Sequence, residues 1–473
     1  MRSNQQAGVI RSGFLRLALV VLATVAGIAN YPQTASAQVG FGAVGGVYVD
    51  AAGMLRDAAS LAQDDRLKRQ QSAAGEPSGA VALASPLRKI SLPRLEAVLE
   101  KAHQAGGALS DDVLHLAGLQ RVQYVFLYPE TNDVVLAGPA GPWRTGDGGD
   151  VVDKTSGRPV LHLDDLLVAL RYAFAEVPTD GFLGCSIEPT DEGMRKHAEF
   201  VGHLQGFDRS QASQVTRGME RAMGPQRALI YGVPPSSRFA LELLAADYRL
   251  KRLALAHDRS PTKKVPSFLD LAAKNISGGP QPQHRWWFVG QYDAIVFTGD
   301  RLAWEFQGNG LRVDTAPTKG TFTDDGPAVK PGRAATQFAE LASREMDDLA
   351  RSIPSFASLQ NLVSLAVAAE LIRRNGEGDV SVSDESSNWR PNHFLDAGAC
   401  PIAEWPIPKQ VPSLANARLV KDRHWLFSTS GGVEITPGRI LDGERTKSAG
   451  DNRLEESRRA ATRQPDPQRW WWD

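Results

Sequence analysis

Residues 234–251 carry the side chains of this sequence best suited to chemistry. An apolar run just before them predicts a strand, and the apolar spacing within them predicts a helix. Ser236, Ser237 and Arg238 then lie between the end of the strand and the start of the helix, where small anions bind in α/β sheets. This pattern predicts a small anionic ligand, with helix capping by the serines as the simpler alternative.

Asp247 and Arg249 lie near the other end of the same predicted helix and complete the candidate ligand-binding set. If both converge with Ser236 on one pocket, the set supports a hydrolase with an unfamiliar site at residues 234–251. If they point apart or lie on open surface, that alternative fails.

Common catalytic signatures are absent from the sequence, which has no H-E-x-x-H, Walker loop, C-x-x-C or G-x-S-x-G. The nine histidines are scattered, so we predict no metal site and no cofactor. Residues 40–45 match G-x-G-x-x-G but lack the preceding strand that a dinucleotide site needs. Asp164 and Asp165 fall where a helix is predicted to begin, and favourable capping explains them.

Cys185 and Cys400 are the two cysteines of the chain. Export, which the amino terminus predicts, would place them in an oxidising compartment where they can form a disulfide. Closing so long a loop would stabilise the fold by roughly 5 kcal/mol in the chain-entropy model. Two buried, unpaired thiols are the alternative.

The first 37 residues have the pattern of a secretory signal peptide. Three arginines precede the apolar run 17–29, and a small-x-small site follows, so we expect cleavage between Ala37 and Gln38. As a helix the apolar run would span about 20 Å, short of a bilayer core of about 30 Å. The pattern predicts a periplasmic or secreted protein with no transmembrane segment in the mature chain.

Composition is that of a globular protein, with 42% hydrophobic and 23% charged residues. The predicted signal holds three arginines and no acid, so its removal changes the net charge from −1 to −4. This balance argues against general nucleic-acid binding, which needs a concentrated positive surface.

Alternating strand and helix patterns predict an α+β or mixed α/β fold, with a βα-type first domain and a smaller second domain of a β-hairpin and a helical pair. The predicted organisation is a signal peptide (1–37), an N-terminal hairpin and linker (38–88), an α/β domain (89–257), a linker (258–283), an α+β domain (284–441) and a disordered tail (442–473). The tail ends in three tryptophans, 470–472, which would be costly to expose and are expected to dock on this protein, a partner or a surface.

Several separated motifs resemble a family of uncharacterised exported proteins, the DUF1598 group, abundant in planctomycete bacteria. The resemblance runs with gaps from about residue 40 to residue 435. Its motifs are GVYVD (46–50), TSGRPVL (155–161), DDL (164–166), CSIEPT (185–190), GVPPS (232–236), ADYR (246–249) and SGGV (430–433). The resemblance implies export and a bacterial source, and it implies no activity, cofactor or catalytic residue.

The sequence therefore favours an exported protein that binds a ligand or a protein partner in the cell envelope. A hydrolase-like enzyme at residues 234–251 and an envelope scaffold that docks through its Trp-ended tail are the alternatives.

Overall fold

The computed structural model describes residues 43–58, 75–77, 79–146, 149–175, 181–204, 208, 210–275, 284–317, 322–323, 326–327, 332–377, 389–420, 423–461 and 469–473. The predicted signal peptide and its cleavage site lie outside these residues. Residues 40–473 form one compact unit that mixes helices with sheets, which confirms the predicted α+β class.

Sheet 1 joins strands from distant parts of the chain. Its order is β13 (Leu311–Pro317), β10 (His284–Gly290), β18 (Arg423–Ile435), β8 (Leu183–Glu188), β9 (Gln226–Tyr231) and β16 (Gln410–Val411), with β17 (Ala415–Val420) also paired to β18. β10 and β18 run parallel, and the other pairs are antiparallel. Alternation along β10 buries Trp286 and Phe288 on one face and leaves Trp287 and Val289 half-buried on the other, as the pleat of a strand requires.

Sheet 2 has the order β19 (Thr446–Ser448), β11 (Ala294–Phe297), β12 (Ala303–Gln307), β4 (Tyr124–Tyr128), β5 (Asp133–Ala140), β3 (Ser85–Ser91) and β20 (Trp471–Trp472). Three small pairs stand apart from the sheets: β1 (Val47–Val49) with β2 (Leu55–Asp57), β6 (Trp143–Thr145) with β7 (Val151–Asp153), and β14 (Phe322–Thr323) with β15 (Gly326–Pro327). The first of these confirms the hairpin predicted near the start of the mature chain.

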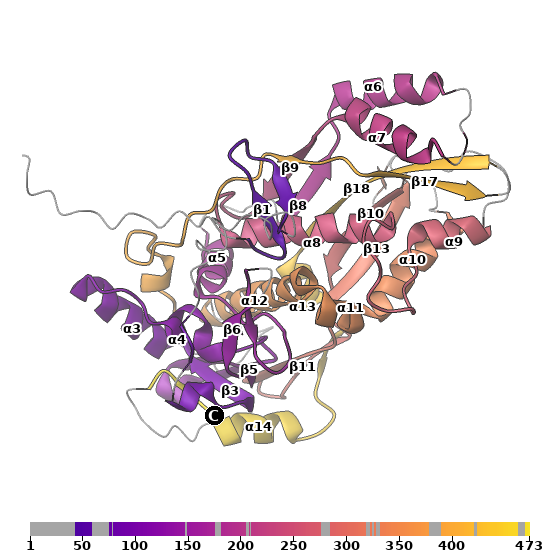
Figure 1. Ribbon diagram of the computed structural model, residues 1–473. Helices are drawn as coiled ribbons and strands as arrows, with labels where there is room; N and C mark the ends of the chain where they lie inside the picture. The colour runs from indigo at the N-terminus through magenta and orange to yellow at the C-terminus, as the bar shows by residue number, and fades with distance from the viewer. Residues whose placement is uncertain are drawn as a thin grey trace, which may run out of the picture. The chain divides into compact units, whose positions relative to one another are not determined.

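The described helices are distributed along the whole unit (Figure 1). They are α3 (Leu92–Ala105), α4 (Asp111–Leu114), α5 (Leu163–Ala173), α6 (Asp191–Gly202), α7 (Ala212–Met223), α8 (Arg238–Ala254), α9 (Phe268–Asn275), α10 (Arg333–Arg344), α11 (Met346–Ser352), α12 (Pro354–Gly376), α13 (Pro437–Asp442) and α14 (Arg453–Ala461). Short 3₁₀ turns cover Gly79–Ala82, Leu116–Gly118, Pro129–Thr131 and His393–Leu395. α8 lies against β8, β10 and β18 of sheet 1, and α10 packs on β13.

The predicted division into two domains at residues 258–283 is wrong. β8 and β9, from the predicted first domain, pair into the same sheet as β10 and β18, from the predicted second domain. β4 and β12 join the two regions in sheet 2 in the same way. Pairing between distant strands leaves no sign in local composition, so a polar, proline-rich segment resembled a boundary.

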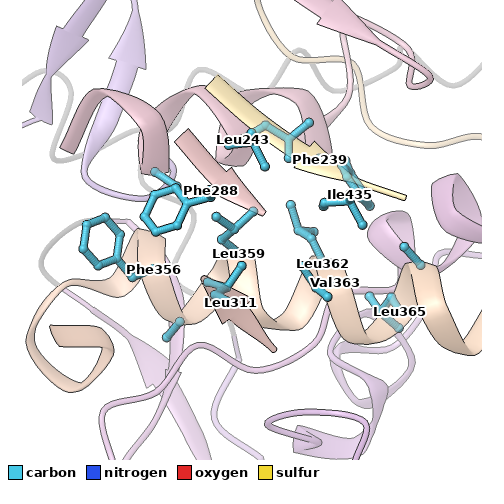
Figure 2. Packing of buried hydrophobic residues seen from close by; sticks show 14 of the residues in the cluster. Phe239, Leu243, Phe288, Leu311, Phe356, Leu359, Leu362, Val363, Leu365 and Ile435 are labelled. Atoms are coloured by element: carbon cyan, nitrogen blue, oxygen red, sulfur yellow. The ribbon is translucent and has the colours of Figure 1, made fainter. Parts of the chain in front are cut away.

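Helix α12 is the centre of the main hydrophobic core. Figure 2 shows Phe356, Leu359 and Leu362 of this helix beside residues of α8, β10, β13 and β18. In the described part of the chain it is the one helix long and apolar enough to cross a membrane, and 94% of its most apolar window is buried inside the protein. Apolar side chains on all sides are typical of a helix enclosed by other elements.

The predicted disorder of residues 442–473 is wrong for the described part of that tail. It contains β19, α14 and β20, and β20 pairs antiparallel with β3 at the edge of sheet 2. Trp470, Trp471 and Trp472 are buried, so the tryptophans dock on this protein, which was one of the three expected outcomes. Arg88, fully buried, donates to both carboxylate oxygens of Asp473 at 2.8 and 3.2 Å and stacks on Trp471. The scaffold alternative required exposed tryptophans in the tail, and these tryptophans are buried.

Candidate functional site

The residues of the predicted ligand set do not converge. Arg238 and Asp247 are nine positions apart on α8, so their side chains leave the helix about 180° apart and about 14 Å apart along its axis. Arg249 leaves the helix on nearly the same side as Arg238 but three turns away. The three charges thus have three different environments, and the hydrolase arrangement at residues 234–251 is not formed.

The two serines have structural roles. Ser237 is the N-cap of α8: its hydroxyl oxygen accepts a hydrogen bond from the Ala240 backbone N–H at 3.2 Å and donates to the Pro234 carbonyl at 2.6 Å. Ser236 is half-buried, and its carbonyl accepts from the Trp405 backbone N–H at 2.7 Å. Capping, the simpler alternative, is therefore confirmed for Ser237, whereas the contact described for Ser236 is made by its backbone.

Arg238 lies at the centre of a buried group of charges that we call the Arg238 cluster, defined as Arg238, Asp150, Asp165 and Glu242. Its guanidinium contacts Asp165 of α5 in a close ion pair, Glu242 of its own helix at 2.7 Å and Asp150 at 3.9 Å. All four residues are at most 9% exposed. One guanidinium thus faces three carboxylates with little access to water.

Glycine at position 45 makes this arrangement possible. The Gly45 N–H donates to both carboxylate oxygens of Asp150, at 3.0 and 3.1 Å. A side chain there would begin 2.8 Å from Glu242 Oε2, and the backbone has a φ of +59° that favours glycine. The last glycine of the G-x-G-x-x-G match therefore supplies a backbone donor to a carboxylate, and the first two glycines lie outside the described residues.

Burial controls the ionisation of this cluster. It raises the pKa of Asp150, Asp165 and Glu242 above their usual range, while attraction to Arg238 opposes the rise. Burial also lowers the pKa of Arg238, but attraction to Asp165 and Glu242 raises it overall, so the guanidinium stays charged. Burial thus favours the protonated form of these three carboxyl groups more than water does, and attraction to Arg238 favours the ionised form.

The flanking groups behave in the same way. Burial raises the pKa of Asp164 to about 6, opposed by a hydrogen bond from the Ala403 N–H. Burial lowers the pKa of His115 to about 4 and that of His162 well below its usual value. A neutral His162 ring suits its position as N-cap of α5, where Nδ1 accepts from the Asp164 N–H at 3.3 Å.

Asp247 forms a second, separate buried pair. Lys251 Nζ lies 2.8 Å from Asp247 Oδ2, and both side chains are at most 2% exposed. Burial lowers the pKa of Lys251 and raises that of Asp247, and each partner opposes the shift of the other. Gly431 of β18 leaves the space: a Cβ there would lie 2.5 Å from Asp247 Oδ1 and 2.3 Å from the Trp286 carbonyl. The pair joins two residues of α8 itself, on the side of the helix that faces β18.

Arg249 ties α8 to the amino-terminal hairpin. Its guanidinium donates to Asp57 of β2, to Asp258 and to the Gly46 carbonyl, at 3.0 to 3.3 Å. Because its guanidinium N–H groups donate to residues of the protein itself, Arg249 stabilises the packing of the hairpin against α8.

Cys185 and Cys400 are free and buried, so the structure contains the alternative of two unpaired thiols and not the predicted disulfide. Cys185 lies in β8 at the centre of sheet 1, and burial raises its pKa well above the usual value. Cys400 lies in the loop after α12 and its carbonyl accepts from Arg171. A thiol that keeps its proton is a poor nucleophile, which argues against cysteine chemistry at residue 185.

The open candidate site is a hollow of about 620 Å³ that we call the strand-end pocket. It lies where the parallel strands β10 and β18 of sheet 1 both end and the chain crosses to sheet 2 twice. One crossing, residues 291–293, leads from β10 to β11, and the other leads from β18 through α13 to β19. β11 and β19 are again parallel neighbours in sheet 2. Ligand sites favour such carboxyl ends of parallel strands and junctions between layers.

The pocket combines an apolar wall with charged groups. Trp287, Tyr292 and Ile295 contribute the apolar wall, and Arg312 is held by Gln291 and by Asp314, the latter at 2.7 Å. Glu434, Arg439, Glu444 and Arg445 surround the other side. None of these residues belongs to the candidate set predicted from the sequence. The contiguous apolar run at residues 286–289 is typical of a strand, but it does not show which of its side chains lies on the open face.

A larger hollow of about 720 Å³ lies beside Trp143, Trp470 and Trp471. Glu76 and Arg469 on its rim adjoin segments outside the described residues, whereas every residue lining the strand-end pocket is described. In the described part of the chain, no group of three or more His, Cys, Asp or Glu side chains has the arrangement of a metal site.

Comparison with curated proteins and with solved structures finds no match. One family matches part of the chain, from Cys185 in β8 to Phe268 at the start of α9, and the matched segment includes Asp247 and Arg249. The bacterial source and the export remain predictions. Residues 185–268 are similar to DUF1598, a family described as protein of unknown function.

Proposed function

We propose that this chain is an exported binding protein that holds a small organic ligand in the strand-end pocket. One observation carries the proposal: a hollow of about 620 Å³ lies at the carboxyl ends of two parallel strands, with an aromatic wall and open charges. Its size is within the range of small-molecule sites, about 300 to 1,000 Å³. The charged side chains of α8 already have partners within the protein.

A fluorescent probe tests the binding role. 1-Anilinonaphthalene-8-sulfonate (ANS) has fused apolar rings and one acidic group, and it fluoresces when it leaves water. We expect saturable binding at one site per chain. Val289→Trp, which places an indole in the pocket from the half-buried side of β10, is expected to abolish that site.

Leu83→Trp is the matched control, because Leu83 is 64% exposed and outside the pocket. It should keep the probe site. Thermal unfolding of both variants checks that each is folded. Equal probe binding by wild type and folded Val289→Trp would contradict the proposal.

Export rests on the amino-terminal pattern of basic residues, apolar run and small-x-small site. Expression of the full chain in a bacterial host, followed by amino-terminal sequencing of the fraction outside the cytoplasm, tests it. A mature chain that begins at Gln38 is expected, and an uncleaved cytoplasmic chain would contradict export.

A further inference from the structure

The charges of the strand-end pocket divide into those that are already paired and those that are open. Arg312 is paired, because its guanidinium donates to Gln291 and to Asp314. Among the described residues, no ion pair within 4.0 Å involves Glu434, Arg439, Glu444 or Arg445. Glu434 is half-buried, and within the described part of the chain its side chain accepts only from the Thr436 hydroxyl, at 3.5 Å.

The open charges balance in number: two arginines and two glutamates are among the residues that line one hollow. A purely anionic ligand would be repelled by the two glutamate carboxylates. A purely cationic ligand would be repelled by the two arginine guanidinium groups. A ligand with one charge of each sign gives both pairs a partner. Arginine suits a carboxylate in particular, because its planar donors can bind both oxygens.

The apolar wall adds a third requirement. Trp287 is half-buried on the open face of sheet 1, and the half-buried Ile440 of α13 adds to the apolar lining. A ligand that fills the hollow therefore carries an apolar group in addition to its two charges.

We infer that the strand-end pocket binds a zwitterion of the amino-acid or short-peptide type. Arg439 and Arg445 bind its carboxylate, Glu434 binds its ammonium group, and an apolar side chain lies against Trp287. This inference rests on the proposed binding function and specifies the class of its ligand.

Four forms of one tripeptide test the assignment: Gly-Phe-Gly with free ends, with an acetylated amino terminus, with an amidated carboxyl terminus, and with both ends blocked. Titration calorimetry with the full mature chain is the measurement. We expect the free form to bind most tightly, and each block to weaken binding by about tenfold or more, because a charged partner is lost.

Variants then assign each end of the ligand. Glu434→Gln should weaken binding of the free peptide by about tenfold and leave the affinity for the acetylated peptide unchanged. The double variant Arg439→Gln with Arg445→Gln should weaken binding of the free peptide and leave the affinity for the amidated peptide unchanged. Glu340→Gln on α10 and Arg217→Gln with Arg221→Gln on α7 change exposed residues outside the pocket, and they should alter no affinity.

The outcomes separate this inference from the proposed function. Equal binding of all four peptides, or probe binding without any peptide binding, overturns the zwitterion class and leaves the pocket as a binding site. A variant that weakens the free and blocked peptides equally overturns the assignment of the ends. Absence of both probe and peptide binding overturns the pocket itself and the inference with it.

Discussion

Arg238 and Arg439 belong to two regions of opposite kinds. In the Arg238 cluster a guanidinium that is 9% exposed is surrounded by three carboxylates from two helices and a loop. In the strand-end pocket Arg439 is exposed and has no described ion-pair partner within 4.0 Å. In the Arg238 cluster the charged side chains pair with one another. In the strand-end pocket the charged side chains remain accessible to a ligand.

The difference shows how strongly burial determines the use of a charge. An isolated charge in the interior is so costly that it must be paired or neutralised, and the raised pKa values of Asp150, Asp165 and Glu242 record that cost. An exposed charge has no such cost and stays available. Perturbed ionisation therefore marks a structural site in this protein, although it often marks catalytic sites elsewhere.

Removal of the buried cation should have the largest effect. Arg238→Met leaves three buried carboxylates without their common partner, and we expect a loss of about 3–5 kcal/mol in the free energy of unfolding at pH 7. Urea denaturation measures it. Arg439→Met, at the exposed position, is the control and should change stability by about 0.5 kcal/mol or less. Equal losses in the two variants would remove the distinction between the regions.

The pH dependence at Asp164 should be the next largest effect. Its pKa is about 6 in the folded protein, above the ordinary 3.8, so its contribution to stability is present at low pH and is lost as the pH rises through 6. Asp164→Asn cannot titrate, and its amide oxygen can still accept from Ala403. From pH 4 to pH 7 the variant should gain about 2.4 kcal/mol relative to wild type.

Chemical denaturation at several pH values compares the two proteins. His115 and His162 titrate in both, so their opposite contribution, a loss of stability as the pH falls below about 6.5, cancels in the difference. A difference that is constant with pH would show that Asp164 is ionised in the folded state as in water.

The smallest effect on stability is expected in the pocket. Arg439→Gln with Arg445→Gln should change the free energy of unfolding by about 0.5 kcal/mol or less, because exposed charges contribute little. The same double variant should weaken the binding of ANS to the pocket by about tenfold at low salt. A large loss of stability would mean that these arginines support the fold.

Local patterns in the sequence predicted local structure well. The serine before an apolar helix predicted the cap that Ser237 forms, and the apolar alternation predicted the hairpin of β11 and β12. Capping and pleating depend on residues a few positions apart, so their signals are contiguous in the chain. The candidate set at residues 234–251 failed for the same reason: adjacency in the chain did not reveal which side of α8 each side chain would take.

The sequence by itself determined the mixed fold class and the cap of α8, and it predicted export. Only the tertiary structure decided that Arg238 meets Asp165, that both cysteines stay free and that the terminal tryptophans complete sheet 2. These outcomes depend on contacts between residues tens to hundreds of positions apart. Such contacts follow from which strands pair, and strand pairing depends on the packing of the whole core.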